Sequence, residues 1–466
     1  MRFGASHDAD VVVIGGGLSG LAAALGVKQR GASVEVLEGA RRPGGTIGTI
    51  HRDGALYETG PNSALDITPL IDALLNATGS RSERIETSPL AAARLVVRRG
   101  KLVALPTSPS EFLATRAFSL RAKLRLAAEP LIARAPEDAE ESVAAFVRRR
   151  LGSEFLDYAV DPFVAGVFAG DPERLSLPAA FPRLRALEQR YGSLIRGQLA
   201  GARERARGAE TAKSAARSFS FRNGMQTLTD AIARTLGRVE TGVRVERVER
   251  DAAASWVVTG TRDGERVVRS ARAAIIAVPA AEASVLVREI APAAAEGLAA
   301  IGYAAVASVA TAYRRADIAD PLAGFGFLAP SKENRQILGS LFSSSMFENR
   351  APPGTALLTT FVGGSRNPDL PGHSDDRIAA IVAGELRALV GARADPLWSA
   401  ITRWPRAIPQ YDLGHRERLS GVDAAERALP GLFFCANFRG GIAVGDCIKS
   451  ADATATAVAQ FLKGRG

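Results

Sequence analysis

Cysteine, histidine and lysine are all scarce in this sequence. Its 466 residues include only two cysteines, Cys435 and Cys447, together with four histidines and seven lysines. Two cysteines cannot build a disulfide framework or a four-ligand zinc site, and four scattered histidines do not form a metal-binding motif. The composition therefore excludes a disulfide-stapled secreted domain and a zinc-built fold, and we expect no metal site.

Long hydrophobic runs are missing as well. The longest uncharged stretches, 11–27 and 297–313, fall at the short limit for a transmembrane helix and are diluted by small and polar residues. The N-terminus carries two aspartates before its apolar run and a glycine-rich turn after it, unlike a signal peptide. We expect a cytoplasmic chain that does not span the membrane.

The positive charge comes almost entirely from arginine. There are 59 basic and 49 acidic side chains, a net charge of +10, and all but seven of the basic residues are arginine. The arginines are spread along the chain without a nucleic-acid-binding motif, so we expect no nucleic-acid partner. The length, with 47% hydrophobic residues, predicts a globular protein of two or three domains.

A strand, a glycine turn and a helix open the chain. Residues 11–14 are a continuous apolar run, typical of a parallel strand buried on both faces. Gly15, Gly17 and Gly20 follow with G-x-G-x-x-G spacing, and residues 21–28 continue at helical spacing. These glycines permit a tight turn, a close approach of backbone to pyrophosphate and close helix–strand packing. The phosphates would then lie at the positive end of the helix.

An acidic residue completes the motif. A second predicted strand, 33–37, leads into Glu38, which lies 18 residues after Gly20. This spacing is near the roughly 20 residues expected for the acid that accepts hydrogen bonds from ribose hydroxyls. A dinucleotide site is predicted because the strand, the glycines, the helix, the second strand and the acid follow one another at the expected spacing.

The choice of dinucleotide depends on a second glycine turn, RRPGG at 41–45. It resembles the R-x-G-G element of the flavoprotein family that includes amine oxidases, phytoene desaturases and protoporphyrinogen oxidases. In that family a second turn of backbone amides supports the flavin side of the pyrophosphate. Many amine oxidases place an arginine directly after the paired glycines, whereas this chain has Thr46, which counts against the amine oxidase branch.

The rest of the chain predicts insertions into the nucleotide-binding fold. Residues 110–217 read as amphipathic helices with apolar and arginine faces, which can lie on an anionic membrane surface or pack on an ordinary core. Alternating residues from about 240 predict an antiparallel sheet that runs into a buried parallel strand at 274–279. A helix is expected at 376–389, and the C-terminus repeats strand, glycine turn and helix.

Several separated motifs resemble those of oxygen-dependent protoporphyrinogen oxidases, and the resemblance covers nearly the whole chain. They are ETGPNSALD (58–66), RLVVRRGKLVALPTSP (94–109), VAGVFAGDPERLSL (164–177), FRNGMQTLTDAI (221–232), GFGFLAPSKE (324–333), FSSSMFENRAP (342–352), RWPRAIPQYDLGH (403–415) and GGIAVGDCI (440–448). The stretches at 164–177, 342–352 and 403–415 are the most restricted.

The resemblance implies an enzyme with non-covalent FAD that takes six electrons from protoporphyrinogen IX in three rounds. Each round would pass a hydride to flavin N5, and dioxygen would be the electron acceptor. The cofactor does the hard chemistry in such an enzyme, so a protein catalytic dyad is not expected. Implied partners are the porphyrinogen and dioxygen, with peripheral membrane contact on the cytoplasmic face, hand-off to ferrochelatase and a homodimer as further expectations.

The resemblance also assigns residues to the two sites. On the substrate side, Arg94 faces a propionate, Phe347 and Leu328 clamp the macrocycle, and Gly166 and Asn62 lie in loops beside it. The guanidinium of arginine suits a carboxylate. On the flavin side the motifs imply Gly15, Gly17, Leu18, Ser19, Gly20, Glu38, Gly39, Arg42, Gly44, Gly45, Thr46, Gly60, Pro61, Asn62, Val245, Trp404, Gly441, Val444 and Asp446. Cys435 and Cys447 are expected to be small core residues.

The predicted fold is α/β, a Rossmann-type FAD-binding domain interrupted by an α+β substrate domain and a helical, membrane-associating domain. The expected boundaries are 1–88, 218–290 and 408–466 for the FAD domain, 89–109 and 291–407 for the substrate domain, and 110–217 for the helical domain. Three alternatives remain at this stage: a coproporphyrinogen III oxidase, a related amine oxidase or polyene desaturase, and a non-catalytic FAD protein that binds porphyrins.

Overall fold

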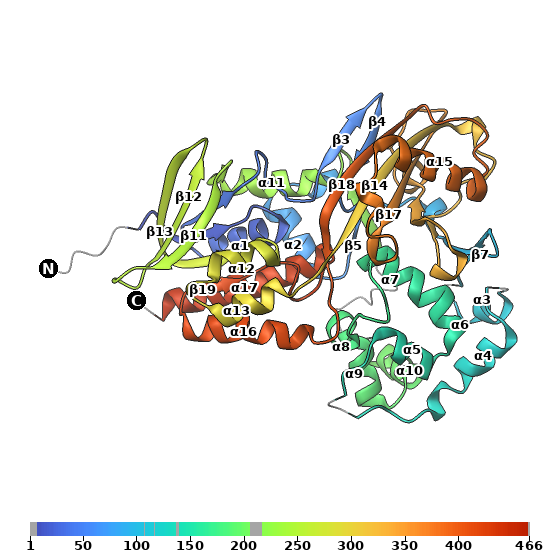
Figure 1. The fold of residues 1–466 in the computed structure, drawn as a ribbon, viewed down its shortest axis with the longest axis horizontal. Helices are drawn as coiled ribbons and strands as arrows, with labels where there is room; N and C mark the ends of the chain where they lie inside the picture. Colours follow the sequence, from blue (N-terminus) through green and yellow to red (C-terminus); the bar gives the residue numbers. More distant parts are fainter. Residues whose placement is uncertain (1–6, 107, 116, 137–138, 206–216, 465–466) are drawn as a thin grey trace.

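A seven-stranded sheet joins the beginning, middle and end of the chain (Figure 1). The computed structural model describes residues 7–106, 108–115, 117–136, 139–205 and 217–464. The strand order is β10-β2-β1-β13-β12-β11, with β19 beside β13. The strands are β1 (Ala9–Ile14), β2 (Val34–Glu38), β10 (Val239–Thr241), β11 (Arg244–Arg250), β12 (Trp256–Arg262), β13 (Glu265–Ile276) and β19 (Leu432–Phe434).

The opening motif folds as its sequence predicts. β1 lies between β2 and β13 and is parallel to both, so both of its edges are paired, and Val11, Val12 and Val13 are fully buried. The predicted helix follows as α1 (Leu18–Gln29). The parallel strand predicted at 274–279 is the C-terminal part of β13, which ends earlier, at Ile276.

Two helical layers cover this sheet. One layer packs on the first face through a Val-, Leu- and Ala-rich core and the other on the second face. The first layer is α1, α2 (Pro69–Ala77), α11 (Gln226–Leu236) and α17 (Val444–Lys463); the second is α12 (Ala280–Val287), α13 (Pro292–Ala299) and α16 (His415–Ala428). Of the first layer, α1 and α17 lie side by side.

A second seven-stranded sheet lies at the upper right of Figure 1, with α15 (Asp375–Val390) packed against it. This helix confirms the one predicted at 376–389. The strand order is β18 (Trp398–Pro409), β14 (Tyr303–Arg314), β17 (Thr355–Gly363), β16 (Ile337–Leu341), β15 (Gly326–Leu328), β7 (Arg94–Arg98) and β8 (Lys101–Ala104). Two small sheets, β3 (Thr49–Arg52) with β4 (Ala55–Glu58), and β5 (Ala64–Leu65), β9 (Ser218–Phe221) and β6 (Arg84–Glu86), lie between.

Helices fill the described part of residues 109–205, as predicted (lower right of Figure 1). They are α3 (Pro109–Ala114), α4 (Leu120–Ala127), α5 (Val143–Arg150), α6 (Ser153–Phe155), α7 (Asp161–Phe168), α8 (Leu177–Ala180), α9 (Pro182–Tyr191) and α10 (Leu194–Arg205), with a π-helical turn at Leu156–Val160. Residues 206–216 of the helical domain predicted at 110–217 lie outside the described residues. Within the described ranges, no helix has the length and apolar character needed to cross a membrane.

Candidate functional site

The first glycine turn forms a cradle that side chains would fill. Gly15 has φ +107°, and a Cβ there would lie 2.6 Å from the carbonyl oxygen of Ala277. A Cβ on Gly20 would lie 2.0 Å from the carbonyl oxygen of Gly15, so α1 can approach the turn only with glycine at this position. A Cβ on Gly17, by contrast, would meet nothing within 4 Å.

The beginning of α1 faces this open side of the turn. Gly17 is the N-cap and has no side chain to accept from the first helical N–H groups, which include those of Leu18 and Ser19. Such N–H groups lack partners within the helix and favour an anion. Open space and unpaired donors together suit a pyrophosphate.

Glu38 is oriented by backbone amides at the end of β2. Its carboxylate oxygens accept from the N–H of Gly16 at 2.6 Å and of Ala40 at 2.7 Å. The N–H of Val243 donates to the Glu38 carbonyl oxygen at 2.9 Å, so the chain after β10 passes directly beside Glu38 and Gly39. Val245, which the resemblance implies as a cofactor residue, lies two residues further along, on β11. The contact of Val243 with Glu38 has no local sequence signal, because β2 and β10 come together only in the folded sheet.

The second glycine turn is hydrogen-bonded to the first. The N–H of Gly44 donates to the carbonyl oxygen of Gly16 at 2.7 Å, and a Cβ on Gly45 would lie 3.2 Å from the Cα of Gly17. Arg42, predicted to contact the cofactor, directs its guanidinium to its own loop: Nη1 donates to the carbonyl oxygen of Ile47 at 2.7 Å. Its observed contacts therefore hold the turn together.

A third turn meets the second from the substrate side. A Cβ on Gly60 would lie 2.2 Å from the carbonyl oxygen of Thr46, so the 59–62 loop, with Pro61 and Asn62, packs directly on the second glycine turn. Nε1 of Trp404, on β18, donates to the carbonyl oxygen of Thr59 at 2.6 Å. The predicted residues Thr46, Gly60 and Trp404 are thus brought together.

The C-terminal glycine turn brings a second helix N-terminus to the same place. Ser19, in the first turn of α1, contacts Cys447, in the first turn of α17. Val444 and Asp446 are also in that first turn, as predicted. The N–H of Gly441 donates to the hydroxyl of Tyr411 at 3.0 Å, so this amide already has a partner within the protein. The N–H groups at the beginning of α17 are those suited to an electronegative ligand.

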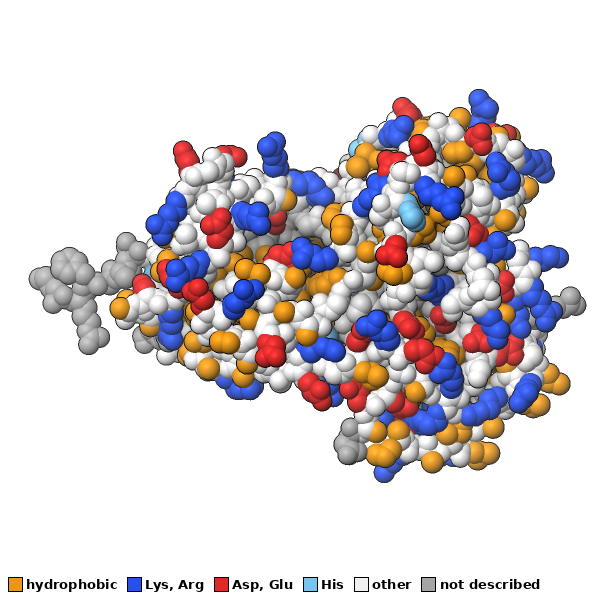
Figure 2. Space-filling view, viewed as in Figure 1, with side chains coloured by type: hydrophobic (Ala, Val, Ile, Leu, Met, Phe, Trp, Pro, Cys, Tyr) orange, Lys and Arg blue, Asp and Glu red, His pale blue; other side chains and the backbone are white. Residues whose placement is uncertain are grey.

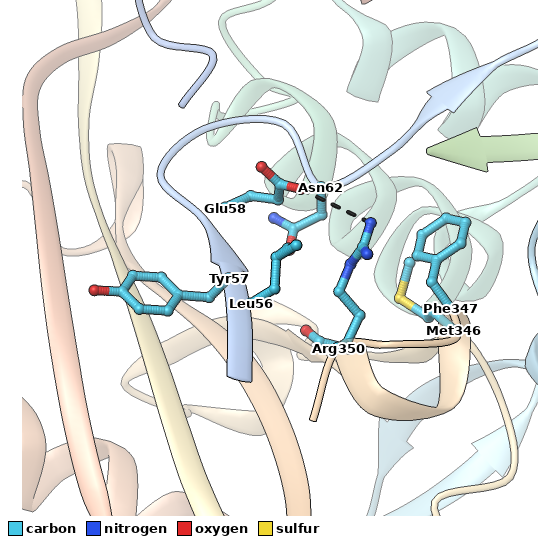
Figure 3. A pocket seen from close by; sticks show the side chains of 8 residues that line it. Leu56, Tyr57, Glu58, Asn62, Met346, Phe347 and Arg350 are labelled. Atoms are coloured by element: carbon cyan, nitrogen blue, oxygen red, sulfur yellow. Dashed lines mark ion pairs between the residues drawn. The ribbon is translucent and has the colours of Figure 1, made fainter. Parts of the chain in front are cut away.

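A small cavity lies next to the 59–62 loop (Figure 3). Asn62 and Phe347, both predicted to face the substrate, line it together. The amide of Asn62 donates to the carbonyl oxygen of Gly60 at 3.2 Å, which fixes its orientation. The complete lining is Leu56, Tyr57, Glu58, Asn62, Ser343, Met346, Phe347 and Arg350.

Two charged groups in this lining were missed by the sequence analysis. Glu58 and Arg350 are 2% and 3% exposed, and an oxygen of Glu58 lies 3.9 Å from Nη2 of Arg350. Arg350 Nη2 also donates to the Ser220 hydroxyl at 2.8 Å, and its guanidinium lies 5.2 Å from the centre of the Phe347 ring. Nη1 has no hydrogen-bond partner within the described residues. Figure 3 shows the guanidinium between Glu58 and Phe347.

Burial dominates the electrostatics of this pair. Desolvation raises the pKa of Glu58 to about 7, although hydrogen bonds from Thr49 and from the Met225 N–H favour its charged form. Desolvation also lowers the pKa of Arg350. Glu58 and Arg350 stand inside the ETGPNS and FENRAP motifs, and that position was the only sequence signal for them.

The remaining predicted substrate residues lie outside the cavity lining. The guanidinium of Arg94, on β7, lies 4.5 Å from the centre of the Phe325 ring and forms no ion pair with another described residue. Phe325 packs in one cluster with Phe347, so Arg94 is one ring removed from the cavity. A Cβ on Gly166 would lie 2.6 Å from Leu328, so these two predicted residues contact each other across α7 and β15.

Comparisons with known proteins agree with this geometry. The sequence profile of the family described as flavin containing amine oxidoreductase matches residues 18–459. The mitochondrial protoporphyrinogen oxidase of Nicotiana tabacum is 34% identical, over 97% of this chain and 95% of the relative. The coproporphyrinogen III oxidase of Bacillus subtilis is 28% identical, over 97% of this chain and 98% of the relative.

Solved structures share the fold. A structure from Exiguobacterium sp. 255-15, provisionally described as a protoporphyrinogen oxidase, has a TM-score of 0.79 at 22% identity and covers 97% of this chain and 98% of its own. A UDP-galactopyranose mutase has a TM-score of 0.71 at 16% identity, over 98% and 96% of the two chains.

Three glycine turns, two helix N-termini and the acid at the end of β2 fit a flavin dinucleotide. The profile match spans most of the chain, and the match to the tobacco enzyme extends over nearly all of it. The chain belongs to the flavin containing amine oxidoreductase family and, within it, to the protoporphyrinogen oxidases.

Proposed function

We propose that the protein oxidises protoporphyrinogen IX to protoporphyrin IX with bound FAD and dioxygen. The observation that supports this most is full-length similarity, at 32–35% identity, to plant protoporphyrinogen oxidases in a chain whose three glycine turns form a dinucleotide cradle. The flavin, when bound, supplies the redox chemistry, taking electrons from the substrate and passing them to dioxygen. The chain's own side chains bind the substrate, orient it and exclude water from the site.

The binding role falls to apolar surface beside the 59–62 loop. Phe347 and Met346 present buried apolar side chains there, and Asn62 is held by its bond to Gly60. Arg94 is the cation that we propose for a substrate carboxylate, because its guanidinium is stacked on Phe325 and has no acidic partner in the described chain. The Arg94 side chain is exposed, and partial desolvation lowers its pKa, yet arginine remains charged in proteins.

The experiment that tests this role is Arg94→Met with protoporphyrinogen and its dimethyl ester. We expect KM for the diacid to rise about tenfold, the scale of one charged hydrogen bond, and the ester to react equally with both proteins. Arg148→Met is the matched control, since Arg148 pairs with Glu173 at an exposed position. An unchanged KM for the diacid would show that Arg94 does not bind a substrate carboxylate.

We propose that the flavin is held without a covalent bond. Cys435 and Cys447 are the two candidate thiols, and both are buried. Desolvation raises the pKa of Cys435 to about 12 and of Cys447 to about 11, so both remain protonated and unreactive. Precipitation with acid should release all of the flavin into the supernatant, and flavin left in the pellet would contradict the proposal.

Coproporphyrinogen III is the second candidate substrate. It is supported by relatives described as coproporphyrinogen III oxidases, at 28% identity from Bacillus subtilis and 32% from Propionibacterium freudenreichii. Comparing kcat/KM for the two porphyrinogens under the same conditions decides between them. A higher value for protoporphyrinogen supports the first proposal, and a higher value for coproporphyrinogen the second.

We propose that α3, α4 and the turn after α4 contact a membrane surface. Leu113, Leu120, Leu124 and Leu131 are 63–84% exposed, so these leucines do not pack on the core. Figure 2 shows apolar side chains at the lower right, over this helical region. An apolar face with interspersed arginines binds anionic lipid. Hand-off to ferrochelatase, a homodimer and the cytoplasmic location remain predictions from the resemblance.

Sedimentation with vesicles tests the membrane proposal. We expect the protein to bind phosphatidylserine-containing vesicles, and Leu120→Glu with Leu124→Glu to abolish that binding without changing activity in detergent. Leu397→Glu is the control, because Leu397 is also exposed, at 49%, but lies just before β18 in the second sheet. Equal binding by all three proteins would show that these leucines are not the contact.

A further inference from the structure

The segment at 410–415, QYDLGH, lies where the flavin side and the substrate side of the molecule meet. Nε2 of Gln410 donates to the carbonyl oxygen of Phe168, at the end of α7, at 2.8 Å. The N–H of Ser176 donates to the carbonyl oxygen of Tyr411 at 2.8 Å. The proposed function gives this segment no role, although it is among the most restricted motifs of the sequence.

The hydroxyl of Tyr411 closes the turn that precedes α17. It donates to the carbonyl oxygen of Asn437 at 2.6 Å and accepts from the N–H of Gly441 at 3.0 Å. The side chain is 3% exposed, so water does not compete for these bonds. Desolvation raises the pKa of this phenol, which keeps its proton available for the bond to Asn437.

His415, the first residue of α16, contacts the same turn. Its ring is stacked on the Tyr411 ring, with centroids 4.2 Å apart and planes at 18°. Nε2 lies 2.9 Å from the carbonyl oxygen of Phe438, a group that only accepts, so Nε2 carries the proton. Burial lowers the pKa of His415, which keeps the imidazole neutral.

The turn is packed tightly against the first turn of α17. Gly441 has φ +118°, and a Cβ there would lie 2.6 Å from the Cβ of Asp446. The N-cap residue Ala443 offers no side-chain acceptor to the helix. A shift of the 437–441 turn therefore moves the N–H groups at the beginning of α17, which are oriented by the Tyr411 and His415 bonds.

We propose that Tyr411 and His415 are positioning residues of the flavin site: their bonds to the 437–441 turn hold the α17 N-terminus where its amides stabilise negative charge on reduced flavin. The inference rests on the flavin-binding part of the proposed function and not on the substrate. Helix N-termini favour anions, and reduction adds electrons to the flavin, so the reduced form depends on this orientation more than the oxidised form does.

The test is Tyr411→Phe, which removes one oxygen and keeps the ring stacked on His415. We expect the holoenzyme to retain flavin and its midpoint potential, measured against reference dyes, to become more negative. A tenfold change in the reduced-to-oxidised equilibrium corresponds to ~30 mV for a two-electron couple, and a shift of about this size is expected. His415→Phe, which keeps a stacked ring but loses the donor to Phe438, should shift the potential in the same direction.

Tyr303→Phe is the matched control. The Tyr303 hydroxyl accepts from a backbone N–H, that of Ala280 at 3.0 Å, but at the beginning of α12 on the other face of the sheet. We expect its melting temperature to fall as in Tyr411→Phe and its potential to match the wild type.

An unchanged midpoint potential in both Tyr411→Phe and His415→Phe would overturn the proposal, because a purely structural bond predicts that result. The same shift in Tyr303→Phe would overturn it as well. A wrong porphyrinogen assignment would give a different result. Porphyrinogens would then leave the flavin oxidised, while the midpoint potentials of Tyr411→Phe and His415→Phe would still shift.

Discussion

The flavin-binding sheet and the helical region differ in what they bury beside their apolar cores. The sheet buries β1 and β2 under α1 and α17 through small and branched apolar side chains. The helical region buries Arg150, Glu129 and Glu188, each fully enclosed, with Arg150 2.9 Å from Glu188 and 3.1 Å from Glu129. The first interior is mainly apolar close packing, whereas the second adds this charge network to an apolar core of its own.

This difference decides what each region tolerates. In the sheet, glycines allow close approach, so an added carbon is the damaging change. In the helical region, taking one partner from a buried pair leaves an uncompensated charge. Arg150 also donates to the carbonyl oxygens of Ile132 at 2.9 Å and Gly192 at 2.6 Å, so it joins three segments.

The largest effect is expected from adding a side chain to the first turn. Gly20→Val should give protein without flavin and with reduced stability, because even the Cβ would lie 2.0 Å from the Gly15 carbonyl oxygen. Gly17→Ala should keep the stability of the apoprotein and lose flavin affinity, because its Cβ would occupy only the open side of the turn. For each variant, flavin absorbance per protein measures flavin content, and the melting temperature of the apoprotein measures stability. Equal flavin content in Gly20→Val and wild type would contradict the assignment of this glycine turn as the dinucleotide site.

Breaking the helical region's charge network is expected to come next. Arg150→Met should cost about 3–5 kcal/mol of stability, because Glu129 would be left buried without its cation, while Glu188 would keep its pairs with Arg149 and Arg185. Arg148→Ala is the control, with its partner Glu173 exposed, and should cost less than ~1 kcal/mol. Denaturant unfolding measures both. Similar losses in the two variants would show that the buried network does not differ from a surface pair.

The buried Glu58–Arg350 pair beside the cavity should make the stability of the protein depend on pH. Its pKa is raised from 4.5 to about 7 by burial, so below pH 7 the folded state holds a proton that the unfolded state releases above pH 4.5. Stability should therefore fall as pH rises between these values, by up to about 3 kcal/mol. Glu58→Gln should lack this slope. Parallel stability–pH curves for the two proteins would contradict the raised pKa.

A small stabilisation is expected from a glycine outside the turns. Gly384 lies inside α15, and a Cβ there would meet nothing within 4 Å. Gly384→Ala should raise stability by roughly 0.5–1 kcal/mol, the usual helical advantage of alanine. Thermal unfolding measures the change. A loss of stability would mean that this glycine has a packing role that the surrounding space does not show.

The two regions also differ in how far sequence alone predicts them. Gly15, Gly17, Gly20 and Glu38 lie within one local strand–helix–strand unit, so their spacing sufficed to predict the turn and its chemistry. The sequence does not show that Arg150 meets Glu188, because the contact joins helices 38 residues apart. Tyr411 and Gly441 meet only because the end of β18 lies beside the beginning of α17. Such pairings are tertiary and leave no local pattern.

The roles of individual site residues show the same limit. The family motif implies Arg42 and Gly441 as cofactor residues, and the structure shows which of their groups already have protein partners: the Arg42 guanidinium donates within its own loop and the Gly441 N–H donates to Tyr411. A motif predicts that a residue is near the site. Which of its atoms faces a ligand is set by the neighbours.

The most direct test of the proposed function is anaerobic mixing of the purified, flavin-loaded protein with protoporphyrinogen, and separately with coproporphyrinogen, followed by air. The account predicts loss of the oxidised-flavin absorbance with protoporphyrinogen, faster than with coproporphyrinogen, and recovery with porphyrin fluorescence when oxygen enters. A fully loaded flavin that neither porphyrinogen reduces would contradict it.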